Sequence, residues 1–402
     1  MRTVAWIIGV LFCLSAVLDA FQTIILPRRP TGRWRVTRVF YQFTWAPWAW
    51  FAGSCSRNPK RREQIYSVYG PASLLLLLVV WALLLINGFG LLYFAIGSPF
   101  SEAATTLAAN STVQHLRTDI YVSGTTLFTL GLGDVLPKSV EARALIVIEA
   151  GTGLGFVALV IGYLPVLYGA FSHREVAVAL LDGRAGSPPT SSELLRRHAF
   201  AGGQDALVAL LIEWERWSAE ILESHISYPI LCYYRSQHDN QSWLSALAAV
   251  LDTCALLISV VPGQASRQAQ LTFAMARHAL VDLCHVFHLE ERQKQWEARG
   301  GPARLDPPEF HRLCNMLELA GMKLCGDPEA PARLRALRGL YEPPAAALAE
   351  YLRMPLPQWV PAPLAKDQWK TVETVRSQAA SVLQDSAVSH LASSSRLHFD
   401  DH

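Results

Sequence analysis

The residues with the clearest chemical potential are the string TLGLGD at positions 129–134. A cation that leaves water needs carbonyl oxygens in exchange for its hydration shell, so successive backbone carbonyl groups must point at one axis. Such a backbone alternates in handedness and is strained, and Gly131 and Gly133 permit it because glycine has no Cβ. The Thr129 hydroxyl would add one more ring of oxygens. The string therefore has the composition of a cation filter.

The flanking residues predict the elements that would position this string. Residues 121–128 have helical character but are too short to cross a bilayer, whereas residues 140–171 form a long apolar stretch. A half-helix, a glycine-punctuated turn and a full span, in this order, build the filter of a tetrameric cation channel. Irregular backbone at membrane depth is tolerated only where protein surrounds it or water fills it. A pore meets this condition.

Together these residues resemble the pore-loop potassium channels, whose filter reads TVGYGD. The similarity runs in register over Tyr121, Ser123, Thr126, Leu127, Thr129, Gly131, Gly133 and Asp134. Three residues depart from the family pattern: Phe128 replaces a threonine, Leu130 a valine and Leu132 the tyrosine. The second filter of some two-pore-domain potassium channels also reads GLGD. The resemblance implies K⁺ as the transported ion, no cofactor, and a filter formed by Thr129, Leu130, Gly131, Leu132 and Gly133.

Two acidic residues are candidates for tuning the pore. Asp134 would stand at the outer mouth, where four copies would form an anionic ring that concentrates cations, although it could also simply hydrogen-bond the turn. Glu149 lies inside the apolar stretch 140–171, and an ionisable residue at that depth suggests a function. It could sit behind the filter, bonded to the pore helix, or line the cavity. The sequence does not choose between these positions.

The predicted inner helix, residues 140–171, also contains residues that weaken a helix. Pro165 removes a backbone hydrogen bond and predicts a kink. A glycine costs about 1 kcal/mol relative to alanine and lets a helix bend, but small residues also allow close packing in membranes. Hinge and packing roles are therefore both open for Gly151, Gly153 and Gly155.

Three apolar runs, residues 4–26, 71–97 and 140–171, are long enough to cross a hydrocarbon core of about 30 Å. The first could instead be a secretory signal peptide. The segment after it is rich in arginine and has no acid before Glu63, so the positive-inside rule places that segment in the cytoplasm. A retained first span then makes the filter open to the exterior. We predict a multi-pass protein of the cell (inner) membrane, with its N-terminus outside and its C-terminal domain in the cytoplasm.

Two features near the first span have expected roles in anchoring. Asp19 is expected to pair with Arg28 or Arg29, or to snorkel to the interface. Residues 41–55 are rich in tryptophan and flanked by arginines, which is typical of a segment at the headgroup level and not of a span.

After residue 173 no run can cross a membrane, and the apolar periodicity is helical. The glycine, proline and serine content of residues 182–192 indicates a domain boundary, and we place a linker at residues 176–192. We predict an N-terminal span with a basic segment (1–63), a pore domain (64–175), this linker, and a helical cytosolic domain of roughly five or six helices (193–402). Residues 369–391 would form an amphipathic helix able to pair with other subunits.

Two clusters in this domain have no assigned role. Residues 223–241 are dense in polar and aromatic groups and could form either a ligand pocket or a buried polar network. His285 and His288, three residues apart, could share a metal ion. Histidines on such a helix are more often satisfied within the core, so we predict no metal site.

The predicted fold is an all-α membrane protein with three transmembrane helices, a re-entrant pore helix and filter, and an all-helical cytosolic domain. One pore loop per subunit requires four subunits to close a ring, so a homotetramer in lipid is expected. The predicted function is potassium-selective conduction. Leu132 prompts the alternative of a nonselective cation channel, and a membrane-tethered sensor with a degenerate pore loop is the rival from another class. The sequence after residue 173 contains neither a nucleophile elbow nor a phosphate loop, so we predict that the protein is not an enzyme. No nucleic-acid partner is expected, whereas an unidentified cytosolic ligand is.

Overall fold

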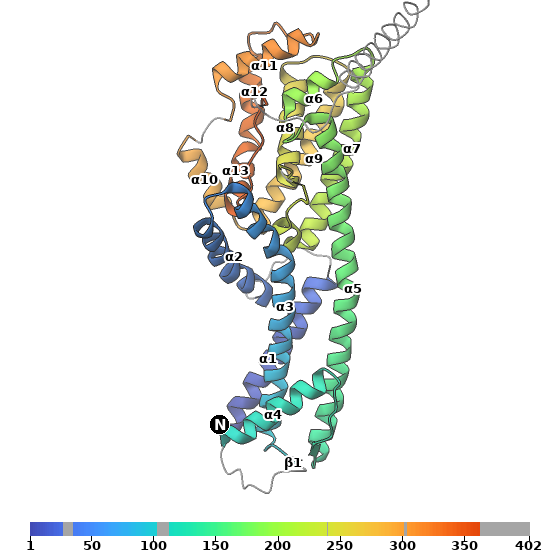
Figure 1. Cartoon of the computed structure of the whole chain (residues 1–402), viewed down its shortest axis with the longest axis vertical. Coiled ribbons are helices and arrows are strands. Elements are labelled where there is room, and N and C mark those ends of the chain that lie inside the picture. Colours follow the sequence, from blue (N-terminus) through green and yellow to red (C-terminus); the bar gives the residue numbers. More distant parts are fainter. Residues whose placement is uncertain (27–34, 103–111, 239, 301–303, 362–402) are drawn as a thin grey trace, which may run out of the picture. The chain divides into compact units, whose positions relative to one another are not determined.

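Helices make up almost all of the regular structure in the computed structural model of the protein (Figure 1). The structure describes all residues except 27–34, 103–111, 239, 301–303 and 362–402. It is 77% helical and contains three candidate membrane spans, so the predicted all-α membrane fold is confirmed. The predicted helix at residues 369–391 lies outside the described residues.

The molecule divides into two units. Unit 1 comprises Met1–His173, Glu220–Ser236 and His285–Phe287, and unit 2 comprises Arg174–Ala219, Gln237–Cys284 and His288–His402. Two short segments from the C-terminal half of the sequence are thus part of unit 1. The domain boundaries drawn from the sequence stay a prediction.

Among the described residues, the helices long and apolar enough to cross a membrane are α1 (Arg2–Ile24), α3 (Pro59–Ala95) and α5 (Val140–Ala185). They coincide with the three apolar runs. α3 has 37 residues and α5 has 46. At 1.5 Å per residue they are about 55 and 70 Å long, so both extend beyond a hydrocarbon core of about 30 Å.

Small residues hold α1 against α3. The buried residues of α1 include Ala5, Gly9, Ala16 and Ala20. A Cβ at Gly9 would lie 2.8 Å from the carbonyl oxygen of Gly88 in α3. Small side chains let membrane helices approach this closely. α1 is thus packed closely into unit 1.

The buried acid of α1 joins three elements of unit 1. Asp19 Oδ2 accepts hydrogen bonds from the backbone N–H of Thr37 and from Trp81 Nε1, both at 2.9 Å. Arg35 Nε lies 3.4 Å from Asp19 Oδ1. The acid is therefore buried and paired with an arginine, and does not snorkel to the interface. The two partners expected from the sequence, Arg28 and Arg29, lie outside the described residues.

The tryptophan-rich segment forms most of α2 (Val36–Cys55), which is not among the candidate spans. α2 packs on α3 through aromatic rings, and the ring centroids of Trp45 and Tyr69 lie 4.8 Å apart. Phe43 and Trp50 of α2 are exposed. One side of α2 thus packs on protein while its aromatic residues on the other side remain open, as expected for an interfacial helix.

Unit 2 is built from helices, whereas the end of α7, the whole of η1 and the last two residues of α9 belong to unit 1. The helices after α5 are α6 (Ser191–Arg197), α7 (Gly203–Ser227), the 3₁₀ helix η1 (Pro229–Tyr233), α8 (Trp243–Ser259), α9 (Ala265–Val286), α10 (Glu290–Ala298), α11 (Pro307–Leu319), α12 (Ala330–Gly339) and α13 (Glu342–Leu352). Eight α-helices thus follow α5 in the described residues, more than the expected five or six. α9 and α10 are separated by a short turn in which His288 has a left-handed φ of 53°.

Residues of the predicted linker are well packed. α5 continues to Ala185, and Ser191 and Ser192 are buried at the start of α6. α8 is buried along almost its whole length and forms the centre of the unit 2 core. Within residues 176–192, α5 therefore continues to Ala185, and the turn of residues 186–190 before α6 is mostly buried.

Candidate functional site

The candidate filter begins where α4 (Thr112–Leu127) ends. Positive φ recurs at every second residue, with 56° at Thr129, 51° at Gly131 and 75° at Gly133. Thr129 adopts this left-handed conformation despite its Cβ, which is a strained state for a β-branched residue. The N–H of Leu130 donates to the Thr125 carbonyl at 2.8 Å and ties the string to the last turn of α4. Alternating handedness is the backbone that turns successive carbonyls toward one side.

The exit of the string is fixed by a side chain and by a small sheet. Tyr121 Oη, on α4, donates to Asp134 Oδ2 at 2.8 Å. Directly after Asp134, strand β2 (Val135–Pro137) pairs antiparallel with strand β1 (Phe100–Glu102). Asp134 is exposed while it accepts this hydrogen bond. Both roles considered for Asp134, a mouth charge and a turn-stabilising acceptor, are compatible with this geometry.

Glu149 lies behind the pore helix. Its Oε2 accepts a hydrogen bond from Tyr93 Oη of α3 at 2.6 Å, and its Oε1 lies within hydrogen-bonding distance of Ser123 Oγ of α4. The carboxyl group is fully buried. Of the two positions left open by the sequence, these contacts match the one in which Glu149 is bonded to α4, and its role in the pore stays a prediction. Tyr93 was not anticipated, because no spacing in the sequence links it to an acid 56 residues later.

Of the three glycines of α5 that were hinge candidates, Gly153 has a steric reason to be glycine. A Cβ at Gly153 would lie 2.0 Å from the carbonyl oxygen of Leu127, the last residue of α4. A Cβ at Gly151 or Gly155 would meet nothing within 4 Å among the described residues. Positions 149 and 153 of α5 thus meet positions 123 and 127 of α4 along one matched stripe. Packing explains Gly153, and a hinge stays a prediction for the other two.

The comparison with known proteins agrees with this arrangement. Residues 79–167 match a protein family described as "Ion channel". By this match the segment is similar to the two-transmembrane pore-loop ion channels. The match starts within α3, ends within α5 and includes α4 and the filter string. We call residues 79–167 the pore-loop channel segment.

One curated relative extends beyond the pore-loop channel segment. The uncharacterized membrane protein YdjJ of Bacillus subtilis (strain 168) is 26% identical over 265 residues, which cover 65% of this protein and 72% of YdjJ. The aligned length exceeds that of residues 79–167, so the similarity includes other parts of the sequence. No solved structure matches the protein.

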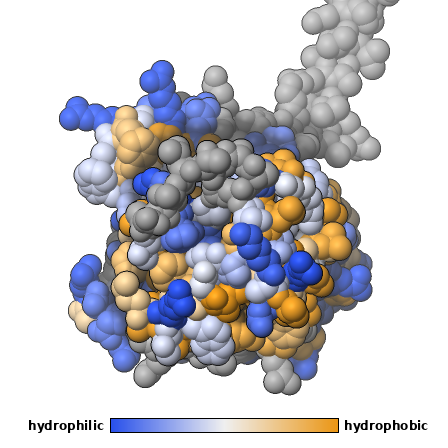
Figure 2. All heavy atoms as spheres, turned by 90° about the horizontal axis from the view of Figure 1, so that it is seen from below, coloured by the Kyte–Doolittle hydropathy of each residue, from blue (hydrophilic) through white to orange (hydrophobic). Residues whose placement is uncertain are grey.

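The pore-loop channel segment exposes apolar residues in a single subunit. Leu130 and Leu132 of the filter are 62% and 63% exposed. In the most apolar 18-residue stretch of α5 only 11% of the residues are buried, whereas 44% are buried in the corresponding stretch of α3. Figure 2 views the molecule from the end that carries α4 and β1, where hydrophobic and hydrophilic residues lie interspersed. The apolar residues of the filter and of α5 remain to be covered by lipid or protein.

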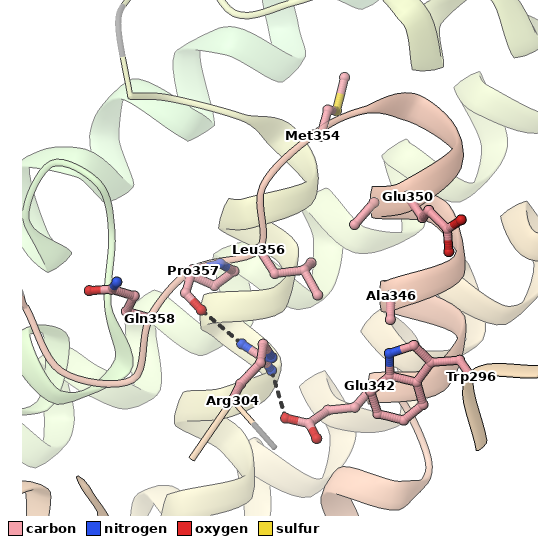
Figure 3. A pocket seen from close by; sticks show the side chains of 10 residues that line it. Trp296, Arg304, Glu342, Ala346, Glu350, Met354, Leu356, Pro357 and Gln358 are labelled. Carbon is pink, nitrogen blue, oxygen red and sulfur yellow. Dashed lines mark hydrogen bonds and ion pairs between the residues drawn. The ribbon is translucent and has the colours of Figure 1, made fainter. Parts of the chain in front are cut away.

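Unit 2 contains a pocket of about 440 Å³ between α10, α13 and the segment that follows α13 (Figure 3). Its apolar wall includes Trp296, Met354 and Leu356. At one end Arg304 forms an ion pair with Glu342 at 3.1 Å and donates to the Pro357 carbonyl at 3.0 Å. Because these charges are already paired, the pocket offers an incoming molecule mainly apolar and aromatic contact.

The ion pair belongs to a buried network. Arg304 donates twice to Asp252, at 2.6 and 2.9 Å, and Tyr341 Oη donates to Asp252 Oδ1 at 2.5 Å. Burial raises the pKa of Tyr341 well above its usual range, and the Asp252 carboxylate adds to this. Burial alone would lower the pKa of Arg304, but Asp252 reverses the effect and raises that pKa. The network is therefore a buried ion pair of Arg304 and Asp252 that the Tyr341 hydroxyl supports.

The two candidate metal ligands occupy the end of α9 and the turn after it. Among the residues that the structure describes, no group of three or more histidine, cysteine, aspartate or glutamate side chains is placed to hold a metal ion. His285 and His288 thus carry no metal-site assignment.

Glu149→Gln is expected to destabilise the pore-loop channel segment. The two carboxylate oxygens of Glu149 accept from the Tyr93 and Ser123 hydroxyls, and glutamine puts an NH2 donor in place of one of these oxygens. One hydroxyl then faces a donor instead of its acceptor, at a cost of about 1–3 kcal/mol. Thermal unfolding of the purified protein measures this cost. Glu141→Gln, at an exposed acid in the first turn of α5, is the matched control. Equal melting temperatures for the two variants would show that the carboxylate is not needed behind the filter.

Proposed function

We propose that four copies of the protein form a potassium-selective channel, with K⁺ as the transported ion and the backbone oxygens of residues 129–133 as its ligands. The observation that carries this proposal is the alternation of positive φ at Thr129, Gly131 and Gly133 within a segment of the pore-loop ion-channel family. A string with alternating handedness at the end of a non-spanning helix has few uses other than lining a pore with carbonyls.

The tetramer follows from the single pore loop and from the exposed apolar surface. One loop supplies a quarter of a ring, so closure needs four subunits. Leu130 and Leu132 are exposed in one subunit, and a neighbouring copy would cover them. The sparse burial of α5 has the same explanation, because an inner helix packs on its neighbours and faces the cavity. Asp134 would then contribute to an anionic ring at the mouth.

We place the channel in the cell (inner) membrane with its N-terminus outside. The arginines between α1 and α3 support this orientation through the positive-inside rule, which also places unit 2 in the cytoplasm. Membership of an ion-channel family argues against an enzyme. The pocket lined by Trp296, Met354 and Leu356 is where we would look for the unidentified cytosolic ligand.

A potassium flux assay tests the proposal. The purified protein in liposomes is expected to pass K⁺ down its gradient, and Gly131→Ala is expected to reduce that flux at least about tenfold, because a Cβ is strained at a φ of 51°. Gly53→Ala is the matched control, since a Cβ at this helical glycine meets nothing within 4 Å. Equal flux from Gly131→Ala and the unchanged protein would overturn the assignment of the filter.

A nonselective cation channel is the second candidate, and Leu132 is the residue that favours it. The tyrosine that the potassium-channel pattern has at this position carries a hydroxyl that leucine lacks. Comparing sodium with potassium flux through the same liposomes separates the two functions. Similar rates for both ions would select the nonselective channel.

A further inference from the structure

The segment from Tyr228 to Arg235, which we call the latch, is remote in sequence from the spans but belongs to unit 1. It contains η1, which begins at Pro229 directly after the end of α7. The residues of η1 from Ile230 to Tyr233 are buried. In η1, the polar and aromatic cluster predicted from residues 223–241 is therefore buried and does not line an open pocket.

The latch covers one stripe of α5 on both sides of Pro165. Before the proline, the ring centroids of Tyr163 and Tyr228 lie 5.6 Å apart. After it, those of Phe171 and Tyr234 lie 5.5 Å apart, and Leu167 shares a hydrophobic cluster with Leu231. The covered positions of α5 are 163, 167 and 171, spaced by four and therefore on one face of the helix.

The opposite side of the latch is fixed to α2 and α3. Tyr233 stacks on Tyr41 at 5.4 Å and packs edge-on against Trp45 at 5.1 Å. A Cβ at Gly70 of α3 would lie 2.7 Å from the Tyr234 ring, so the two elements are in direct contact. Arg235 adds an ion pair with Glu63 at 3.4 Å. The latch thus bridges the N-terminal part of α3 and the C-terminal part of α5.

Bending of α5 at Pro165 must break or move these contacts. Proline removes one intrahelical hydrogen bond, so the helix is locally weak, and contacts on both sides of it oppose a bend. The residues before Glu220 and after Ser236 belong to unit 2. Any rearrangement of unit 2 that pulls on these flanking residues therefore acts on the latch, and through it on α5.

We propose that the latch is the gating link of the channel: it holds the part of α5 that follows Pro165 against α3 and passes changes in unit 2 to the inner helix. The gating role rests on the proposed channel function, whereas the restraint on α5 does not. Weakening the latch should let α5 move without altering the candidate filter. Among the hydrophobic and aromatic contacts given above, none joins a latch residue to residues 129–133.

Hydrogen exchange tests the restraint in the full-length protein in lipid nanodiscs. In Tyr234→Ala, backbone amides of residues 167–173 should exchange at least about tenfold faster than in the unchanged protein. Gly70→Ala, which pushes on the Tyr234 ring from α3 and leaves α5 untouched, should act in the same direction. Gly53→Ala is the control, because its added Cβ meets nothing within 4 Å. Unchanged exchange in both Tyr234→Ala and Gly70→Ala would overturn the latch.

Single-channel recording tests the gating role with the same variants. The open probability of Tyr234→Ala and Gly70→Ala should differ at least about fivefold from that of the unchanged protein, while the reversal potential stays the same. An unchanged open probability in a protein that conducts would refute the gating role. Absence of current from the unchanged protein would count against the proposed channel function, and the exchange experiment would still decide whether the latch restrains α5.

Discussion

Gly153→Ala is expected to abolish ion conduction and to lower the stability of the protein. The added Cβ would lie 2.0 Å from the carbonyl oxygen and 2.8 Å from the carbonyl carbon of Leu127. Both are backbone atoms at the end of α4, two residues before the filter begins, so neither can turn aside as a flexible side chain would. Forcing a methyl group into a packed site costs about 1–3 kcal/mol and shifts the backbone. Potassium flux in liposomes and thermal unfolding measure the two effects.

The same helix supplies the controls. A Cβ at Gly151 or at Gly155 meets nothing within 4 Å, and alanine favours a helix over glycine by about 1 kcal/mol. Gly151→Ala and Gly155→Ala should therefore unfold at the same temperature as the unchanged protein or at a higher one. If Gly153→Ala conducts and melts as these variants do, the close packing of α5 on the pore helix is not what this glycine provides.

Arg304→Ala is expected to lower the free energy of unfolding by about 3–5 kcal/mol, the usual cost of removing one partner from a buried ion pair. The Arg304 side chain is 13% exposed and its partner Asp252 is 0% exposed. Without the guanidinium, the Asp252 charge stays buried with no cation at hydrogen-bonding distance among the described residues. The variant also loses the contact of Arg304 with the Trp359 ring, whose centroid is 5.6 Å away.

An exposed ion pair in unit 2 gives the comparison. Arg292 and Glu350 approach to 3.4 Å but are 46% and 57% exposed. Exposed pairs contribute about 0–1 kcal/mol, so Arg292→Ala should change the free energy of unfolding far less than Arg304→Ala. Chemical denaturation of both variants in the same detergent measures the difference. Equal losses would mean that burial does not govern these two ion pairs.

The sequence predicted the parts of the molecule whose signals are local. Length and hydropathy identified α1, α3 and α5. The string at 129–134 could be recognised because its glycines match the positive φ values that the local backbone requires. The positions that the sequence left open depend on distant partners. The place of Glu149 depends on Tyr93, and the role of Gly153 depends on a carbonyl of α4.

Other differences have the same origin in tertiary contacts. The partner of Asp19 in the described residues is Arg35, beyond the two nearer arginines, because the start of α2 returns to α1. Composition suggested a linker at residues 176–192; in the structure Ser187, Thr190, Ser191 and Ser192 are buried there, whereas Val176 and Leu180 are exposed. The latch was seen only as a dense polar and aromatic cluster, since its partners on α3 and α5 precede it by more than fifty residues.

The most direct test of the proposed channel is the reversal potential of the purified protein in planar bilayers, under a potassium gradient that an opposite sodium gradient balances. We predict reversal near the potassium equilibrium potential, with the current lost in Gly131→Ala because the filter backbone requires glycine at that position. Reversal near zero would contradict potassium selectivity and favour the nonselective channel. A complete lack of current at all voltages would contradict the proposal that the protein conducts ions.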